Sequence, residues 1–202
     1  MFLEAQALTT DNAIGQGRVV LAFEYDGRGF HGWQMQKSGV RSVAGELAAA
    51  VAKVAAHPVE LVCAGRTDAG VHASYQIAHF ETGAIRNLRS WVMGINTALP
   101  DDISVHWAGQ GLDDFHARFS AIKKSYVYTI YLDRAPPDEE AFVWSCRDTS
   151  IDFLSMQTAS QHFLGKQDFT AFSAVHSKDK DPDPVKEIHS LELKQRGPKI
   201  TV

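Results

Sequence analysis

One short segment, Cys63 to Ala73 with the sequence CAGRTDAGVHA, gathers several residue types that could do chemistry. It holds one carboxylate, Asp68, and the guanidinium of Arg66 stands two residues before it. Gly65 and Gly70 bracket the carboxylate, and glycine accepts positive φ angles and sharp turns. We therefore expect a loop that presents Asp68 at a sheet edge, where an ionised carboxylate can serve as a nucleophile or a base. The competing interpretation is an ordinary turn, because Asp and Gly are common turn residues.

The residues around this loop predict a sheet with two helices. Alternating apolar residues over 21–25 predict a first strand. Ser42 is expected to cap one helix, and Asn87 a second helix that stops at Pro100. Three further strands are expected, at residues 60–64, 75–81 and 103–107. The resulting order, βαββαβ, is the ferredoxin-like split pattern.

The second half of the chain begins a similar series. The expected elements are a strand, a helix, a strand, a hairpin turn and a strand, at residues 126–132, 153–163, 188–194, 196–198 and 200–202. By this count the series lacks a closing helix and strand. Natural domains avoid an open sheet edge and an uncovered apolar face, so we expect a chain truncated at its C-terminus. A different, complete topology is the alternative.

Composition narrows the class of protein. A chain of 202 residues with 45% hydrophobic and 22% charged residues is globular. No stretch approaches the ~18 consecutive apolar residues of a membrane span, and the start does not resemble a signal peptide, so we expect a cytoplasmic protein. The two cysteines fit a reducing compartment, and the nine histidines form no tight pairs typical of zinc sites, so we expect no metal. The formal charge of −4 does not decide whether nucleic acid binds, because phosphate binding depends on clustered charge.

Five motifs occur in an order that is typical of one family. They are YDGRGFHGWQMQ, CAGRTDAGVHA, DDFHARFSA, KSYVY and DFTAF, beginning at Tyr25, Cys63, Asp113, Lys124 and Asp168. Through them the chain resembles the bacterial tRNA pseudouridine synthase A (TruA) family over nearly everything from Arg18 to Val202. GRTDAGVHA is highly specific for that family, and the first and third motifs support it.

The resemblance implies an α+β fold in which two ferredoxin-like halves share a mixed, mainly antiparallel sheet. We then expect a flexible tail over residues 1–17 and an N-terminal half with the Asp68 loop over 18–112. The C-terminal half, without its last helix and strand, would cover 113–202. The resemblance also implies a homodimer with one tRNA crossing both subunits.

The resemblance further implies that the protein isomerises uridine to pseudouridine in the anticodon arm of tRNA, at positions 38 to 40. The glycosidic bond from N1 to C1′ is broken, the uracil turns, and C5 bonds to C1′. This reaction needs no redox change and no phosphoryl group, so no cofactor is expected. By the family's motif the catalytic carboxylate is Asp68.

The resemblance assigns substrate-binding roles as well. Arg66 matches the arginine that extrudes the base and holds phosphates, and Tyr126 matches the tyrosine that packs on the target base. From the sequence alone, Arg66 could instead pair with a carboxylate, and Tyr126 could be half-buried packing. Four further basic residues, Arg41, Arg118, Lys123 and Lys124, could form a positive surface that binds the tRNA. The alternative is that these charges are scattered and solvated.

Four other residues of these motifs have two interpretations each. His72 and His116 could contact RNA, but satisfied structural histidines are the favoured interpretation. Phe30 and Trp33 could shape a cleft or belong to the core.

Family members continue past the position of Val202 into a segment whose basic side chain pairs with the catalytic Asp. The sequence has no such segment, so the alternative to an active synthase is a catalytically impaired tRNA-binding remnant of the family. An unrelated α+β protein, with Asp68 in a simple turn, is the third hypothesis.

Overall fold

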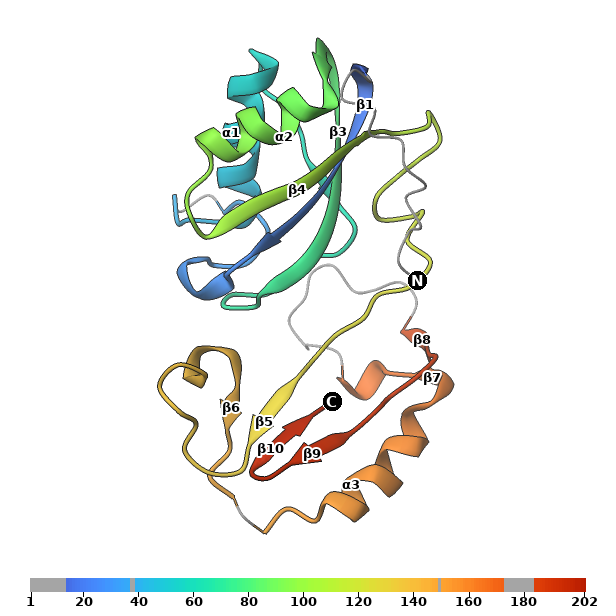
Figure 1. Cartoon of the computed structure of the whole chain (residues 1–202). Helices are drawn as coiled ribbons and strands as arrows, with labels where there is room; N and C mark the ends of the chain where they lie inside the picture. Colours follow the sequence, from blue (N-terminus) through green and yellow to red (C-terminus); the bar gives the residue numbers. More distant parts are fainter. Residues whose placement is uncertain (1–13, 37–38, 149, 173–183) are drawn as a thin grey trace. The chain divides into compact units, whose positions relative to one another are not determined.

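The computed structural model describes residues 14–36, 39–148, 150–172 and 184–202 of a mixed α+β protein with several sheets (Figure 1). The chain divides into two compact units, Met1–Lys124 and Ser125–Val202. Most of the expected N-terminal tail, residues 1–13, lies outside the described residues.

The first unit is a four-stranded sheet with two helices. Its elements are β1 (Ile14–Tyr25), the short 3-10 helix η1 (Gly27–Gly29), α1 (Val43–Ala55), β2 (Val62–Cys63), β3 (Ala73–Asn87), α2 (Leu88–Ala98) and β4 (Ile103–Gln110). The strand order in the sheet is β2-β3-β1-β4, with antiparallel pairing between all neighbours. The βαββαβ order is the one that the sequence predicts for this half.

Two strands are longer than the alternation of apolar residues in the sequence predicts. β1 begins at Ile14, ahead of the predicted strand over 21–25, and β3 runs to Asn87, past the end of the predicted strand over 75–81. The reason is their mutual pairing, which extends from Ile14 opposite Asn87 to Tyr25 opposite Ala73 and passes through two register shifts. The backbone ladder therefore continues where the apolar alternation has already ended, and residues 14–17 belong to a strand rather than to a tail.

Both predicted helix caps are present. The Ser42 hydroxyl accepts a hydrogen bond from the Gly45 N–H at 3.2 Å, and the Asn87 side chain accepts one from the Ser90 N–H at 2.6 Å. Each bond satisfies one of the backbone donors that the first turn of a helix leaves free. α2 ends at Ala98, ahead of Pro100, as predicted.

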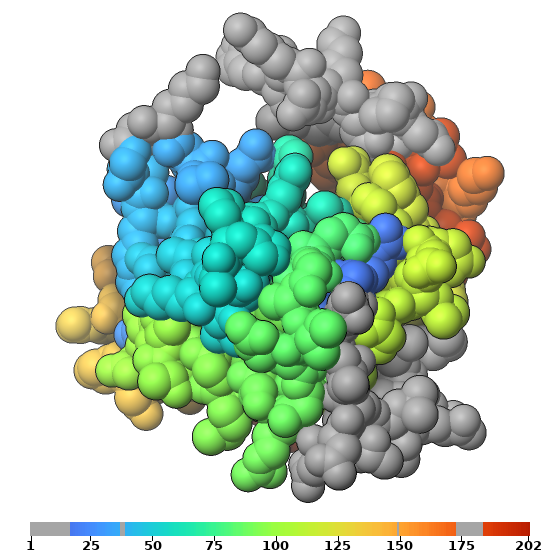
Figure 2. Space-filling view, turned by 90° about the horizontal axis from the view of Figure 1, so that it is seen from above, coloured from blue at the N-terminus to red at the C-terminus, as the bar shows by residue number. Residues whose placement is uncertain are grey.

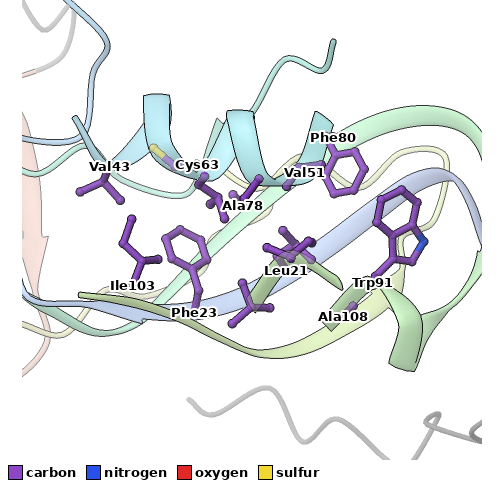
Figure 3. Packing of buried hydrophobic residues seen from close by; sticks show 14 of the residues in the cluster. Leu21, Phe23, Val43, Val51, Cys63, Ala78, Phe80, Trp91, Ile103 and Ala108 are labelled. Carbon is purple, nitrogen blue, oxygen red and sulfur yellow. The ribbon is translucent and has the colours of Figure 1, made fainter. Parts of the chain in front are cut away.

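The core of this unit lies between the sheet and its helices (Figure 3). Leu21 and Phe23 of the central strand β1 are fully buried, as are Val51 of α1 and Trp91 of α2. The Trp91 and Phe80 rings meet edge to face, with 5.3 Å between their centroids. α1 and α2 contact each other, and both contribute to the outer surface of the unit (Figure 2). The sheet thus has one face packed against helices, which gives its loops a rigid base.

The second unit contains shorter elements. They are β5 (Thr129–Tyr131), η2 (Glu140–Phe142), β6 (Trp144–Ser145), α3 (Phe153–Ser160), η3 (Gln161–Phe163), β7 (Gly165–Asp168), η4 (Thr170–Phe172), β8 (Val185–Ile188), β9 (Lys194–Arg196) and β10 (Lys199–Thr201). The described strands of this unit form one sheet in the order β6-β5-β10-β9 and a separate β7-β8 pair. The strand pairing of the described residues therefore gives one four-stranded sheet in each unit and the β7-β8 pair.

The long strand predicted over 126–132 is too long. Within this range β5 covers Thr129–Tyr131, and these residues pair with β10. Two backbone hydrogen bonds of 2.9 Å between Tyr128 and Val202 complete this ladder. Alternation in the sequence predicts an extended backbone, but the length of a strand depends on the partner that it pairs with.

Two other predictions for this half need correction. The strand expected over 188–194 is absent: residues 189–193 are outside any strand, and only Ile188 and Lys194 belong to strands, β8 and β9, which lie in different sheets. The helix expected over 153–163 changes to a 3-10 turn at Gln161. The predicted turn at 196–198 is confirmed as the connection of the β9-β10 hairpin.

Residues 113–124, assigned from the sequence to the second half, belong to the first unit. The guanidinium of Arg18 on β1 donates hydrogen bonds to the carbonyls of Asp113 and Phe115. The Ala117 N–H donates to Nδ1 of His79 on β3 at 3.1 Å. These contacts hold the segment against the sheet, so the chain divides after Lys124 rather than at residue 112.

His79 is a buried titratable side chain in this region. Its ring lies edge-on to the His116 ring, with 5.1 Å between the centroids. Burial lowers the pKa of His79, and the nearby Arg18 and His116 lower it further, while Glu81 acts in the opposite direction. The folded protein therefore keeps His79 neutral at pH values where the unfolded chain takes up a proton.

We expect the free energy of unfolding to decrease as the pH falls through the ordinary histidine pKa of about 6.5. In that range the unfolded state binds a proton at residue 79 and the native state does not, so protonation favours unfolding. His79→Asn, whose side-chain oxygen can still accept the Ala117 N–H, should lose this part of the pH dependence. Urea unfolding of both proteins at about pH 7.5 and 5.5 measures it, with the exposed His106→Asn as control. Identical pH dependence in the parent and His79→Asn would contradict the prediction.

Candidate active site

The loop that carries Asp68 connects β2 to β3, and β2 is an edge strand of the sheet. The side chains of Asp68 and Arg66 are exposed to solvent. The loop turns after Asp68, where Gly70 has a φ of +78° and the Val71 N–H donates to the Asp68 carbonyl at 3.2 Å. The predicted presentation of a carboxylate at a sheet edge is thus the observed geometry.

Gly65 has a different role from the one predicted. It is not among the described residues with positive φ. A Cβ atom on Gly65 would instead lie 3.3 Å from the ammonium nitrogen of Lys124. The missing side chain leaves room for Lys124 beside the loop, which brings a third charged group to the neighbourhood of Arg66 and Asp68.

The loop is anchored by the segment that follows β1, residues 26–33. The Trp33 N–H donates to the Thr67 carbonyl at 2.9 Å, and the Gly70 N–H donates to the Phe30 carbonyl at 3.3 Å. These hydrogen bonds hold the backbone on both sides of Asp68. The side chains of Phe30 and Trp33 are buried, which confirms their interpretation as core residues and fixes this segment to the rest of the unit.

Two glycines allow the segment and the loop to approach each other closely. A Cβ atom on Gly27 would lie 2.1 Å from the Val71 carbonyl oxygen. A Cβ atom on Gly32 would lie 2.7 Å from the Thr67 carbonyl oxygen, and Gly32 has a φ of +87°, which few other residues adopt. Any side chain at either position would displace the loop that presents Asp68.

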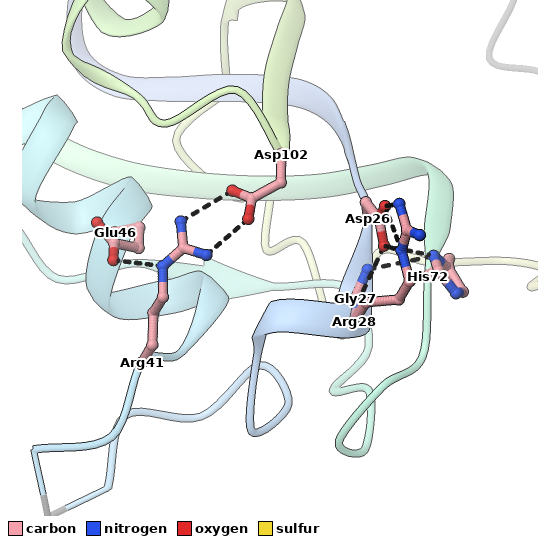
Figure 4. A network of polar contacts seen from close by, with 7 residues as sticks. All are labelled: Asp26, Gly27, Arg28, Arg41, Glu46, His72 and Asp102. Carbon is pink, nitrogen blue, oxygen red and sulfur yellow. Dashed lines mark hydrogen bonds and ion pairs between the residues drawn. The ribbon is translucent and has the colours of Figure 1, made fainter. Parts of the chain in front are cut away.

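A polar network closes the far end of the loop (Figure 4). Nδ1 of His72 lies 3.2 Å from the Gly27 N–H nitrogen and 3.2 Å from a carboxylate oxygen of Asp26. Arg28 in turn donates to Asp26 at 2.8 Å and holds the pKa of this carboxyl below its ordinary value. His72 is therefore a structural histidine that ties the loop to the segment after β1, as the favoured interpretation predicts.

Arg41 is paired rather than available to RNA. Its guanidinium donates two hydrogen bonds to Asp102, at 2.6 and 2.9 Å, and a third to Glu46 at 3.0 Å (Figure 4). It also lies 4.3 Å from the centre of the Phe30 ring. Its charge is compensated by two carboxylates, so the predicted positive surface does not gain Arg41.

Two further predicted binding residues are Arg118 and Tyr126. Arg118 is exposed on residues 113–124, where its guanidinium lies 5.8 Å from the Phe119 ring centre. Nδ1 of His116 accepts hydrogen bonds from the N–H groups of Arg118 and Phe119, a structural role. Tyr126 belongs to the second unit, and its side chain is exposed. Asp68, Arg66 and Lys124 are the predicted residues that the first unit brings together around one loop.

Three residues near the loop were not found from the sequence. Tyr25 and Gln76 are buried under the loop, and Thr67 directly precedes Asp68. In the sequence, Tyr25 looks like an ordinary core residue of a strand, and Gln76 looks like an ordinary polar residue of a strand. Their proximity to the loop results from the pairing of β1 with β3, so no local signal marks them.

The described residues include no group of three or more His, Cys, Asp or Glu side chains that could hold a metal ion. Cys63 and Cys146 are free thiols, and burial raises the pKa of the Cys63 thiol. None of the described helices is long and apolar enough to cross a membrane.

The fold and the site define an α+β protein in which a rigid sheet edge presents a carboxylate and an arginine on one anchored loop. A sequence model of the tRNA pseudouridine synthase family matches residues 21–120. tRNA pseudouridine synthase A of Alcanivorax borkumensis is 48% identical over 182 residues, which are 89% of this chain and 67% of that protein. The enzymes of the same name from Shewanella sp. (strain MR-4) and Pseudomonas aeruginosa are each 46% identical over 92% of this chain, covering 70% and 64% of their lengths. The chain belongs to the tRNA pseudouridine synthase family.

Proposed function

We propose that this protein isomerises uridine to pseudouridine in tRNA, with Asp68 as the reacting carboxylate. The observation that carries the proposal is the exposed Asp68 in a loop whose backbone is anchored on both sides. Catalysis requires a reacting group to be held in a defined geometry, and the hydrogen bonds on both sides of Asp68 hold its backbone in this way. The names of the relatives support the same reaction and the same substrate.

The reaction rearranges one nucleotide without an external reactant. The N1–C1′ bond breaks, the uracil ring turns, and a C5–C1′ bond forms. The hydrogen on C5 leaves as a proton, and N1 gains a proton, so the product has the composition of the substrate. One ionised carboxylate is sufficient for this sequence, acting as a nucleophile or as a base toward a proton of the sugar.

The charged groups around Asp68 could bind a nucleotide that has left its base stack, which this reaction requires. A stacked uridine must leave its stack before a carboxylate can reach the glycosidic bond. We assign Arg66 to the extruded nucleotide and its phosphate, since a guanidinium can donate to phosphate through two parallel bonds. Lys124 and Arg118 would contact the tRNA backbone, and Tyr126 would stack on the target base, an interaction of roughly 1–3 kcal/mol.

The finer features of the proposal rest on the five motifs. They are modification at positions 38 to 40 of the anticodon arm, action as a homodimer, and a second ferredoxin-like half. The βαββαβ order of the first unit supports the architecture. The molecular mass of the protein in solution tests the homodimer.

Tritium release tests the activity. The protein is incubated with a tRNA transcript that carries tritium at C5 of uracil, and we expect the label to appear in water as C5 loses its hydrogen. A transcript with cytidine in place of each uridine at positions 38 to 40 serves as the control and should release no label. Absence of release from the first transcript contradicts the activity, and equal release from both contradicts the assigned positions.

Filter binding with a salt titration, run beside this assay, separates catalysis from binding alone. Binding through phosphate contacts weakens steeply with salt. Salt-sensitive tRNA binding without tritium release would favour the tRNA-binding remnant over the synthase.

A further inference from the structure

Two buried polar side chains, Tyr25 and Gln76, form hydrogen bonds with the active-site loop. The Tyr25 hydroxyl and the Thr67 hydroxyl are 2.7 Å apart, within one hydrogen bond. The Gln76 side chain acts on the Tyr25 hydroxyl by lowering its pKa, against the larger effect of burial. Gln76 in turn donates to the Gly65 carbonyl at 2.8 Å. Tyr25 therefore holds the loop at Thr67, and Gln76 holds it at Gly65.

These two contacts hold the loop on either side of Arg66. Gly65 precedes Arg66, and Thr67 stands between Arg66 and Asp68. Both anchoring side chains come from the sheet, Tyr25 from β1 and Gln76 from β3, and these strands pair along their length. Tyr25 and Gln76 thus attach the loop that carries Arg66 and Asp68 to the paired strands of the sheet.

Tyr25 is placed for a polar role as well as for packing. Its side chain is 4% exposed, and its ring stacks with Phe23 at 6.1 Å between centroids. A buried hydroxyl without a partner is costly, so a core strand position without such a role would be filled more favourably by phenylalanine. Burial raises the pKa of Tyr25.

We propose that the Tyr25 and Gln76 side chains are positioning residues that set the geometry of Arg66 and Asp68 through Thr67 and Gly65. The inference rests on the proposed function for its catalytic consequence. Its structural part, an ordered loop that depends on the Tyr25 hydroxyl, stands independently of the reaction.

Removal of one hydroxyl at a time tests the inference. Tyr25→Phe and Thr67→Val each delete one side of the same hydrogen bond, and we expect each to lower kcat about tenfold with little change in KM. The double variant should lose no more than either single variant, because both remove one interaction. Thr67→Ser, which keeps the hydroxyl, should restore most of the activity.

Thr82→Val is the matched control. Thr82 lies on β3, is buried, and has its own hydrogen bond of 2.8 Å, to His57. This variant removes a comparable buried hydroxyl away from the loop, so it should lower thermal stability and leave kcat unchanged. Tyr25→Phe and Thr67→Val with parental kcat, or losses that add in the double variant, would overturn the inference.

Hydrogen exchange of the amides in residues 64–72 provides a readout that needs no turnover. We expect faster exchange in Tyr25→Phe and in Thr67→Val than in the parent, and parental exchange in Thr82→Val. An inactive parent with faster loop exchange in both variants would refute the proposed function and keep the positioning role. Unchanged exchange in both would refute the positioning role whatever the activity.

Discussion

Asp68→Asn should abolish tritium release from tRNA while leaving tRNA binding and thermal stability close to those of the parent. Asparagine has nearly the same size but can be neither a nucleophile nor a base at this position. A positioned acid or base contributes typically about 10²- to 10⁴-fold to a rate, so a loss of at least that size is expected. The Asp68 side chain is exposed, so its replacement removes no packing.

Single-turnover rates measure this effect most clearly, because they separate the chemical step from product release. Asp101→Asn, an exposed carboxylate ahead of β4, is the matched control and should retain the parental rate. A rate for Asp68→Asn within a few-fold of the parent would show that another group carries the reaction.

Gly32→Ala should have the second largest effect on activity. The added Cβ would lie 2.7 Å from the Thr67 carbonyl oxygen, and the φ of +87° is strained for alanine. The loop must shift to relieve the contact, and a displacement of about 1 Å at a reacting group can cost about 10²-fold in rate. The chemical groups all remain, so tRNA binding should fall much less than the single-turnover rate.

Gly17→Ala separates strain from displacement. Gly17 has a similar φ of +71°, but a Cβ atom added there would meet no neighbouring atom within 4 Å, and Gly17 stands at the far end of β1 from the loop. Gly17→Ala should lower thermal stability about as much as Gly32→Ala does, but it should keep the parental single-turnover rate. Equal rate losses in both variants would indicate general destabilisation instead of a displaced loop.

Local signals in the sequence were sufficient for much of the first unit. Ser42 and Asn87 cap their helices as predicted, because a cap is a contact within a few residues. Strand lengths were predicted less well, since they depend on a partner that is distant in sequence. β3 continues to Asn87 because β1 pairs with it as far as that residue.

The candidate site shows the same difference. Asp68 could be located from its own loop, where two glycines and an arginine surround it. The contacts that hold the loop could not be predicted from the sequence, because they join residues 26–33 to residues 64–72, which are distant along the chain. Gly27 and Gly32 resemble ordinary turn glycines in the sequence, and only the close approach of the two backbones explains why a side chain does not fit.

The chemical identity of the product tests the central claim most directly, because other reactions at C5 of uracil also release tritium. An unmodified tRNA transcript is incubated with the protein, digested to nucleosides, and separated by chromatography with mass detection. We predict a new nucleoside that has the mass of uridine and elutes with pseudouridine, absent when Asp68→Asn replaces the parent. A product of different mass, or pseudouridine formed equally by Asp68→Asn, would contradict isomerisation by this carboxylate.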